Sequence, residues 1–111
     1  MGFYSGEDLL EKESWTGGAR FDLFSATWPF ATLSVTKENL ELISYKIKLA
    51  FRPEQIEKIE SIGFIPFVGK GIRIHHRLDP LTNPKKVIFW YLTKDTKWLV
   101  EKLKTWGYGD V

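Results

Sequence analysis

The sequence predicts a mainly β domain, a small antiparallel β-barrel or sandwich of about seven strands capped by one C-terminal α-helix. Three observations lead to this fold class. Residues 45–52 alternate between apolar and charged or small side chains, two strand-like runs follow at 72–77 and 87–92, and a helical pattern begins near residue 95. Alternation is typical of a strand with one buried face, because successive side chains point to opposite sides.

Length and composition are those of one folded domain. The chain has 111 residues, 43% of them hydrophobic, and no cysteine. A chain of this length can bury a core, and without cysteine it has neither disulfides nor thiolate metal ligands. We found no secretory signal and no apolar run near the ~20 residues of a membrane span. We therefore expect a cytoplasmic protein without a transmembrane segment.

The first 26 residues have the least defined pattern. Residues 7–13 could form one or two helical turns, which Thr16-Gly17-Gly18 would end. Residues 20–24 could then be a short strand, followed by a connection at 25–27. We accordingly predict an N-terminal extension of residues 1–26 and a domain of residues 27–111.

The early strands follow from residue 28. Residues 28–36 alternate, Lys37-Glu38-Asn39 predicts a tight turn, and residues 40–43 return as the second strand of a hairpin. The third strand has the cleanest alternation. Its expected inward face is Tyr45, Ile47, Leu49 and Phe51.

Residues 53–63 allow two interpretations. Ile56, Ile59 and Ile62 are spaced by three, which favours a short helix, whereas the strands on both sides favour a further strand. We predict a turn at 53–55 and then a strand at 56–62 with a bulge. Residues 64–71 are expected to form a loop or an interrupted hairpin, whose apolar side chains either pack under the sheet or form an exposed patch.

The last elements are clearer. Ile72, Ile74 and His76 are expected on one face of a strand, and a long turn follows at 78–84. Residues 87–92 are apolar on both faces, which is typical of a central strand. A helix is predicted from Asp95 to Trp106, with a buried stripe of Leu99, Val100, Leu103 and Trp106, and Gly107 ends it.

The charges are unevenly distributed along a chain of net charge +2. Residues 1–15 hold four acidic residues and one lysine, a local −3, and residues 70–86 hold five basic residues and one aspartate, a local +4. The basic residues could form an anion-binding face or only a solvated surface. The candidate ligand-binding residues are Arg52, Lys70, Arg73, His75, Arg77, Lys85 and Lys86.

Catalytic and metal-binding signatures are absent from the sequence. His75 and His76 are adjacent on a strand, so their side chains point to opposite faces and cannot converge on one metal. Gly69-Lys70-Gly71 lacks the spacing of a phosphate-binding loop. No aromatic platform is interleaved with the basic residues, so we expect no nucleic-acid partner. We predict a protein that is not an enzyme and that has no cofactor and no metal site.

Several segments resemble one known superfold. Residues 28–40 resemble the opening hairpin of the GRAM and bacterial PH-like families, 52–59 their turn and Ile-rich strand, and 71–76 the next strand. Phe89-Trp90-Tyr91-Leu92, followed by Leu99 and Leu103, is similar to their last strand and plugging helix. The resemblance covers roughly residues 27–106 and implies a PH-like, non-enzymatic binding module. Its members bind phosphoinositides, other acidic lipids, peptides or proteins.

Three classes of function follow from this sequence. The first is a protein-interaction or homo-oligomerising module, whose interface would use Trp15, Phe64 and Phe67. The second is a module that binds anionic lipid or phosphoinositide through the basic face, at an acidic membrane surface. The lipid-binding members of the family use a basic loop between early strands, whereas the turn at 37–39 is short and has one lysine. An enzyme is the third and least favoured class.

Overall fold

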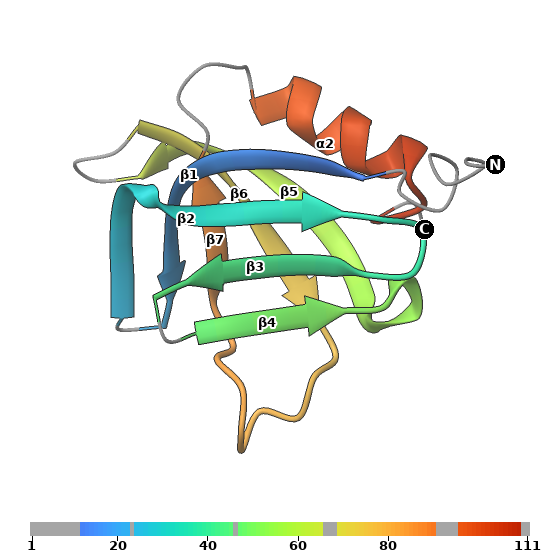
Figure 1. Ribbon diagram of the computed structural model, residues 1–111, viewed down its shortest axis with the longest axis horizontal. Helices are drawn as coiled ribbons and strands as arrows, with labels where there is room; N and C mark the ends of the chain where they lie inside the picture. Colours follow the sequence, from blue (N-terminus) through green and yellow to red (C-terminus); the bar gives the residue numbers. More distant parts are fainter. Residues whose placement is uncertain (1–11, 23, 46, 66–68, 91–95, 110–111) are drawn as a thin grey trace, which may run out of the picture.

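The computed structural model describes residues 12–22, 24–45, 47–65, 69–90 and 96–109, without the side chains of residues 63–65 and 69. In these residues seven antiparallel strands form one sheet with the order β4-β3-β2-β1-β7-β6-β5. The sheet curls into a half-barrel with a C-terminal helix beside it (Figure 1). This confirms the predicted mainly β class, and the order is consistent with a PH-like topology. The elements are β1 (Glu13–Phe21), β2 (Phe24–Val35), β3 (Leu40–Ser44), β4 (Ile47–Phe51), the 3-10 turn η1 (Pro53–Gln55), β5 (Ile56–Ile65), β6 (Gly69–His76), β7 (Val87–Trp90) and α2 (Thr96–Thr105).

The strand β1 lies in the middle of the sheet, between β2 and β7. The prediction that Thr16-Gly17-Gly18 ends an element is therefore wrong, because these residues are inside β1. The glycines are needed for close packing rather than for a turn. A Cβ on Gly17 would lie 2.0 Å from the Trp90 carbonyl oxygen, and one on Gly18 would lie 2.2 Å from the Trp90 ring. Residues 13–26, which the sequence analysis set apart from the domain, thus supply β1 and the start of β2. The helical turns considered for residues 7–13 fall largely outside the described residues, and Glu13 is in β1.

The strand β2 is longer than predicted and contains a bulge. It begins at Phe24, so residues 25–27 are not a connection. Gly17 pairs with Ala31 and Ala19 pairs with Ala26, which leaves residues 27–30 of β2 opposite Gly18 alone. A bulge of this kind bends its strand and redirects the side chains. The exposed residues 27–30 are a consequence of it.

The hairpin from β2 to β3 is as predicted. The Thr36 hydroxyl accepts hydrogen bonds from the backbone N–H groups of Glu38 and Asn39, both at 3.2 Å, and the Thr36 N–H donates to the Asn39 carbonyl. In β4, Leu49 and Phe51 are buried and Ile47 is partly buried, as expected. The prediction for Tyr45 is wrong: it lies in the β3–β4 turn with a φ of 41° and is 67% exposed.

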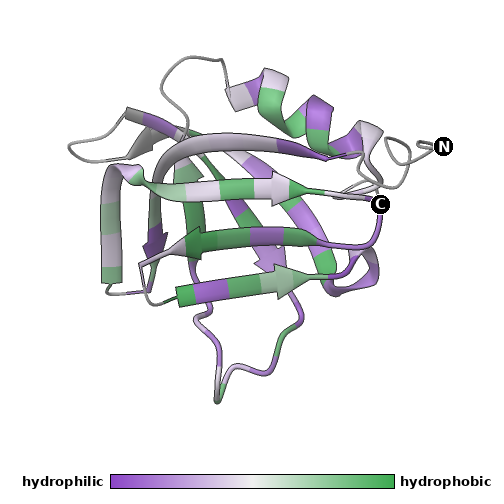
Figure 2. Ribbon diagram, in the orientation of Figure 1, coloured by the Kyte–Doolittle hydropathy of each residue, from purple (hydrophilic) through white to green (hydrophobic). Residues whose placement is uncertain are grey.

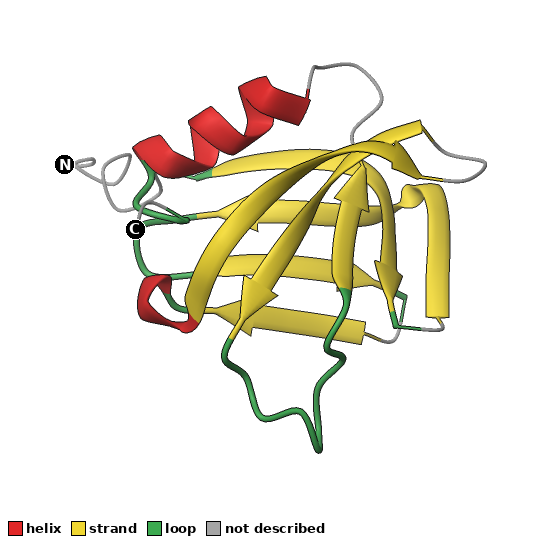
Figure 3. Cartoon of the chain, turned by 180° about the vertical axis from the view of Figure 1, so that it is seen from behind, coloured by secondary structure: helices red, strands yellow, loops and turns green. Residues whose placement is uncertain are grey.

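The second half of the sheet is β5, β6 and β7, which lie behind β2–β4 in Figure 1 and in front of them in Figure 3. The predicted turn at 53–55 is η1, and β5 follows it with an irregularity between Ile56 and Lys58. Of the two alternatives for residues 64–71, the interrupted hairpin is confirmed, because β5 continues to Ile65 and pairs with β6 from Gly69 after a register shift beyond Ile62. The strand β7 is buried throughout and lies between β1 and β6, which confirms a central position.

The helix α2 completes the core. Leu99, Val100 and Leu103 are buried, Trp106 packs partly against them, and the helix contacts β5 and β6. Asp95, the predicted start, lies outside the described residues. Gly107 has a φ of 97° and turns the chain, as predicted, so that Tyr108 enters the core. The Tyr108 hydroxyl donates to the Thr36 carbonyl at 2.8 Å, and burial raises the pKa of this phenol far above its usual value.

Candidate functional site

Three of the predicted basic residues, Arg73, His75 and Arg77, lie along β6 and the residue that follows it. The neighbouring strand β5 places carboxylates beside them. His75 Nε2 is 2.8 Å from Glu60 Oε1, and Arg77 Nε is 3.3 Å from Glu57 Oε2. Glu60 is also the residue directly opposite Arg73. The hydrogen bond from His75, together with the charge of Lys58, lowers the pKa of Glu60. These basic side chains therefore lie beside carboxylates of the same sheet.

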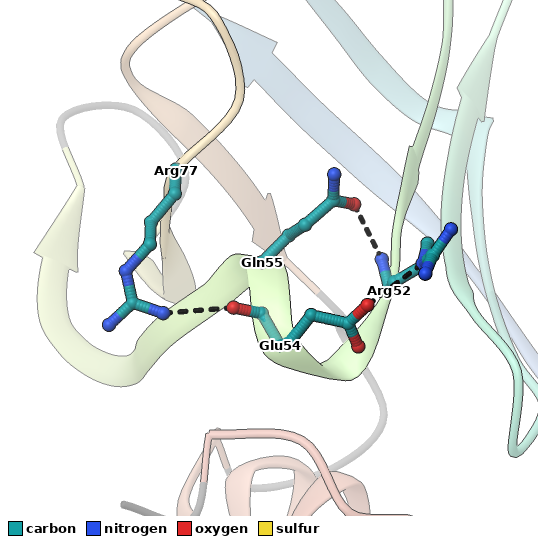
Figure 4. A network of polar contacts seen from close by, with 4 residues as sticks. All are labelled: Arg52, Glu54, Gln55 and Arg77. Atoms are coloured by element: carbon teal, nitrogen blue, oxygen red, sulfur yellow. Dashed lines mark hydrogen bonds and ion pairs between the residues drawn. The ribbon is translucent and has the colours of Figure 1, made fainter.

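Arg52 lies across η1 from Arg77 (Figure 4). Its Nε donates to Glu54 Oε2 at 2.9 Å, and its backbone N–H donates to the Gln55 side chain. Arg77 Nη1 donates to the Glu54 carbonyl at 2.8 Å. The Glu54 backbone N–H and the Arg52 side chain both lower the pKa of the Glu54 carboxyl. The two arginines thus fasten η1 between β4 and the end of β6.

The three predicted lysines lie apart from this network. Lys70 is exposed near the start of β6, whereas Lys85 and Lys86 precede β7. The Asp22 carboxylate accepts hydrogen bonds from the backbone N–H groups of Lys85, at 3.1 Å, and Lys86, at 2.8 Å. These bonds, first that from Lys86, lower the pKa of Asp22. The structure therefore brings Arg73, His75 and Arg77 into one row and places Lys85 and Lys86 beside the β1–β2 turn; their role in binding stays a prediction.

An exposed apolar region lies on the other half of the sheet. We call it the aromatic surface. Its centre is Phe24, Phe30 and Tyr45, which a ring stack and a shared hollow bring together, and Trp28 and Ile43 are further exposed hydrophobic residues of β2 and β3. Trp28 is 51% exposed and Phe30 is 50% exposed. The rings of Phe30 and Tyr45 stack with their centroids 5.3 Å apart and an angle of 25° between their planes.

A hollow of about 500 Å³ opens within this surface, lined by Phe24, Ser25, Tyr45 and Ile47. Two local features shape the surface around it. The β2 bulge turns residues 27–30 outward, and the positive φ of Tyr45 turns its ring away from the core. Figure 2 shows that hydrophobic residues recur along β3 and β4, next to this region. The hollow is apolar and has few hydrogen-bonding groups, so it suits apolar side chains.

The residues predicted for an interface have different outcomes. Trp15 is buried, with 7% exposure, and its ring meets that of Trp98 edge-on at 6.2 Å. Its assignment to an exposed interface is wrong, because β1 points its side chain into the core. Phe67 lies outside the described residues, as does the side chain of Phe64. Phe24, Trp28 and Phe30 were not predicted as interface residues, although Pro29, between the last two, is typical of an irregular or edge strand.

The two histidines have separate partners. His76 Nδ1 accepts a hydrogen bond from the Leu78 N–H at 3.1 Å, so Nε2 carries the proton and donates to the Pro84 carbonyl at 2.9 Å. His76 thereby holds both ends of the β6–β7 loop, while His75 faces Glu60. Within the described residues, no three histidine, cysteine or carboxylate side chains gather as a metal site would require.

Comparisons with known proteins give no family assignment. No family model matches the chain, and no curated protein sequence matches it. Of the helices in the described part of the chain, none has the length and apolar character needed to cross a membrane. What the structure defines is the class of fold, a curled seven-stranded antiparallel sheet with a C-terminal helix.

Proposed function

We propose that this chain is a non-enzymatic binding module of the PH-like, GRAM-related kind, which docks a protein partner or a second copy through the aromatic surface. The observation that carries the proposal is the exposed Phe30–Tyr45 stack beside an apolar hollow. Exposed clusters of large apolar side chains mark interaction sites, and aromatic residues dominate the energy of protein interfaces.

The energetics of burial support this surface. Fully burying one aromatic side chain contributes about 1.5–3 kcal/mol. Trp28, Phe30 and Tyr45 each expose half or more of their surface. Their contacts also require little ordering, because the stack already fixes two of the rings, and preorganised groups lose less entropy on binding.

The basic residues of β6 are less suited to binding a ligand than the aromatic surface is. His75 and Arg77 already contact Glu60 and Glu57, and an anionic ligand would have to compete with these carboxylates. The exposed rings of the aromatic surface have no comparable competitor among the contacts described above. A protein segment with apolar side chains is therefore the preferred partner.

Selection of random 12-residue peptides displayed on phage tests the proposal. Peptides selected on the wild-type chain should lose binding to the double variant Phe30→Thr, Tyr45→Asn. They should keep binding to Leu81→Ser, a matched control that removes an exposed apolar side chain outside the hollow. Peptides that bind all three proteins equally, or a selection that enriches none, would overturn the proposal.

An anionic-lipid module is the second candidate, because Lys85 and Lys86 lie beside the turn that leads to Phe24. Basic residues next to exposed aromatic rings favour an acidic membrane surface. Sedimentation with vesicles of phosphatidylserine and phosphatidylcholine tests it. Pelleting that falls with salt and with Lys86→Glu supports this candidate, and equal pelleting with neutral vesicles contradicts it.

A further inference from the structure

We infer that the aromatic surface of one copy binds residues 1–11 of a second copy, so that the chain associates head to tail. The inference rests on the proposed function, since it uses the same surface and names its occupant. Three observations support it: the chemistry of the hollow and its surroundings, the composition of residues 1–11, and the distance between them along β1.

The hollow combines an apolar floor with positive charge nearby. Phe24, Tyr45 and Ile47 line it. The β1–β2 turn connects it to three exposed cations, because Arg20 Nε donates to the Asp22 carbonyl and the Asp22 carboxylate binds the backbone of Lys85 and Lys86. The side chains of Lys85 and Lys86 are exposed, so an acidic segment bound at the hollow would lie close to two positive charges.

The first eleven residues have the complementary composition. They contain three acidic side chains and no basic one, together with apolar residues on both sides of these charges. The acidic residues are Glu7, Asp8 and Glu11, and the apolar ones are Met1, Phe3, Tyr4, Leu9 and Leu10. A segment with both apolar side chains and carboxylates would fit an apolar hollow with a cationic edge. Opposite charges would speed the encounter, and apolar contacts would stabilise the complex.

Distance favours a second copy over the same chain. Glu13 lies beside the C-terminal part of α2, where its carboxylate accepts a hydrogen bond from Trp106 Nε1 and pairs with Lys102. From there β1 runs nine residues, roughly 25–30 Å of strand, before the turn that leads to the hollow (Figure 1). Residues 1–11 can extend over about 36–40 Å at most. Within one chain only about the first three residues would reach the hollow, and the carboxylates would be left behind.

Binding in trans has a geometric consequence. Residues 1–11 and the aromatic surface are different parts of the chain, so the contact is heterologous. In a dimer, one copy would keep an unused aromatic surface and the other an unused N-terminal segment. Association should therefore continue with concentration or close into a ring, and it should weaken as salt screens the carboxylates.

Sedimentation velocity on full-length chains tests the inference with two complementary variants. The segment variant is Leu9→Ser, Leu10→Ser, and the surface variant is Phe30→Thr, Tyr45→Asn. Wild type should sediment faster as its concentration rises, and each variant alone should remain a monomer. An equimolar mixture should give a dimer and nothing larger, because only one intact segment and one intact surface remain. Leu81→Ser should associate like wild type.

The remaining outcomes separate this inference from the proposed function. If wild type associates and only the surface variant abolishes association, residues 1–11 are not the occupant, while the proposed function stands. If wild type is monomeric at all concentrations, or if the mixture stays monomeric, the inference in trans is overturned, and the phage selection still decides the proposed function. Association that both variants retain contradicts both. Should the double surface variant lose its cooperative melting, Tyr45→Asn alone carries the same expectation.

Discussion

The two halves of the curled sheet differ in their exposed side chains, although both have ion pairs between strands, such as Lys48 with Glu41 on β3 and β4. On β5 and β6, basic side chains and carboxylates are paired across the strands, as in His75 with Glu60 and Arg77 with Glu57. On β2 and the β3–β4 turn, stacked and exposed aromatic rings take their place. The first arrangement pairs two of its basic side chains with carboxylates of the same chain, whereas the second leaves apolar area in water. Whether an exposed charged residue can bind a ligand therefore depends on whether it already pairs with another residue of the chain.

The joint between the halves, β1 against β7, gives the largest expected effect. Gly18→Ala would place a Cβ 2.2 Å from the Trp90 ring, which is part of a buried strand. Overpacking of this kind costs about 1–3 kcal/mol and occasionally more, and we expect the upper end or a failure to fold. Chemical denaturation measures the change. Gly107→Asn is the comparison, because nothing lies within 4 Å of the added Cβ and only the backbone strain of a φ of 97° is introduced, which asparagine tolerates better than most residues. Equal stability of Gly18→Ala and wild type would contradict the close packing of the two halves.

The adjacent histidines separate a structural contact from a surface one. His76→Leu removes the acceptor of the Leu78 N–H and the donor to the Pro84 carbonyl. We expect a loss of about 1–3 kcal/mol, since polar groups left without a partner are costly. His75→Leu removes only the contact with Glu60 on the outer face, and pairs of this kind are worth about 0–1 kcal/mol. Urea unfolding of both variants compares them, and a larger loss in His75→Leu would reverse the assignment.

The sequence predicted the elements that repeat a simple pattern. Alternation in β4 and β6, the apolar run of β7 and the helical stripe of Leu99 and Leu103 all have the predicted faces, because burial on one side imposes those periods. The Gly17-Gly18 pair was misread, because glycine in a strand can mark a close approach of another strand as well as a turn. That partner, Trp90, lies more than 70 residues away in the sequence.

The candidate site was predictable only in part. The basic residues of β6 were found, but their carboxylate partners depend on the β5–β6 register, which the sequence does not specify. The aromatic surface depends on a bulge in β2 and on a positive φ at Tyr45. Both are local departures from alternation, and a method that looks for alternation assigns such residues to the wrong face.

Asp22 links the two halves through the backbone of Lys85 and Lys86, and this link should depend on pH. The hydrogen bonds lower its pKa below the ordinary value of 3.8, so the ionised carboxylate stabilises the folded state above that pH. The contribution should be lost as the pH falls through the lowered pKa, where the carboxylate takes up a proton. Asp22→Asn should therefore melt below wild type at neutral pH, and the two melting temperatures should converge in acid. A difference that persists unchanged to pH 2 would contradict this origin.

The smallest change in stability is expected at the aromatic surface, and it is the most informative for function. Tyr45→Asn removes a ring that is 67% exposed from a position with a φ of 41°, which asparagine adopts more readily than tyrosine. Loss of the stack with Phe30 lowers the stability, and relief of backbone strain at residue 45 raises it. We therefore expect the free energy of unfolding to change by about 0.5 kcal/mol or less. Binding of selected peptides should nevertheless fall at least tenfold. A residue retained for stability would show the reverse, a clear loss in unfolding free energy with unchanged binding.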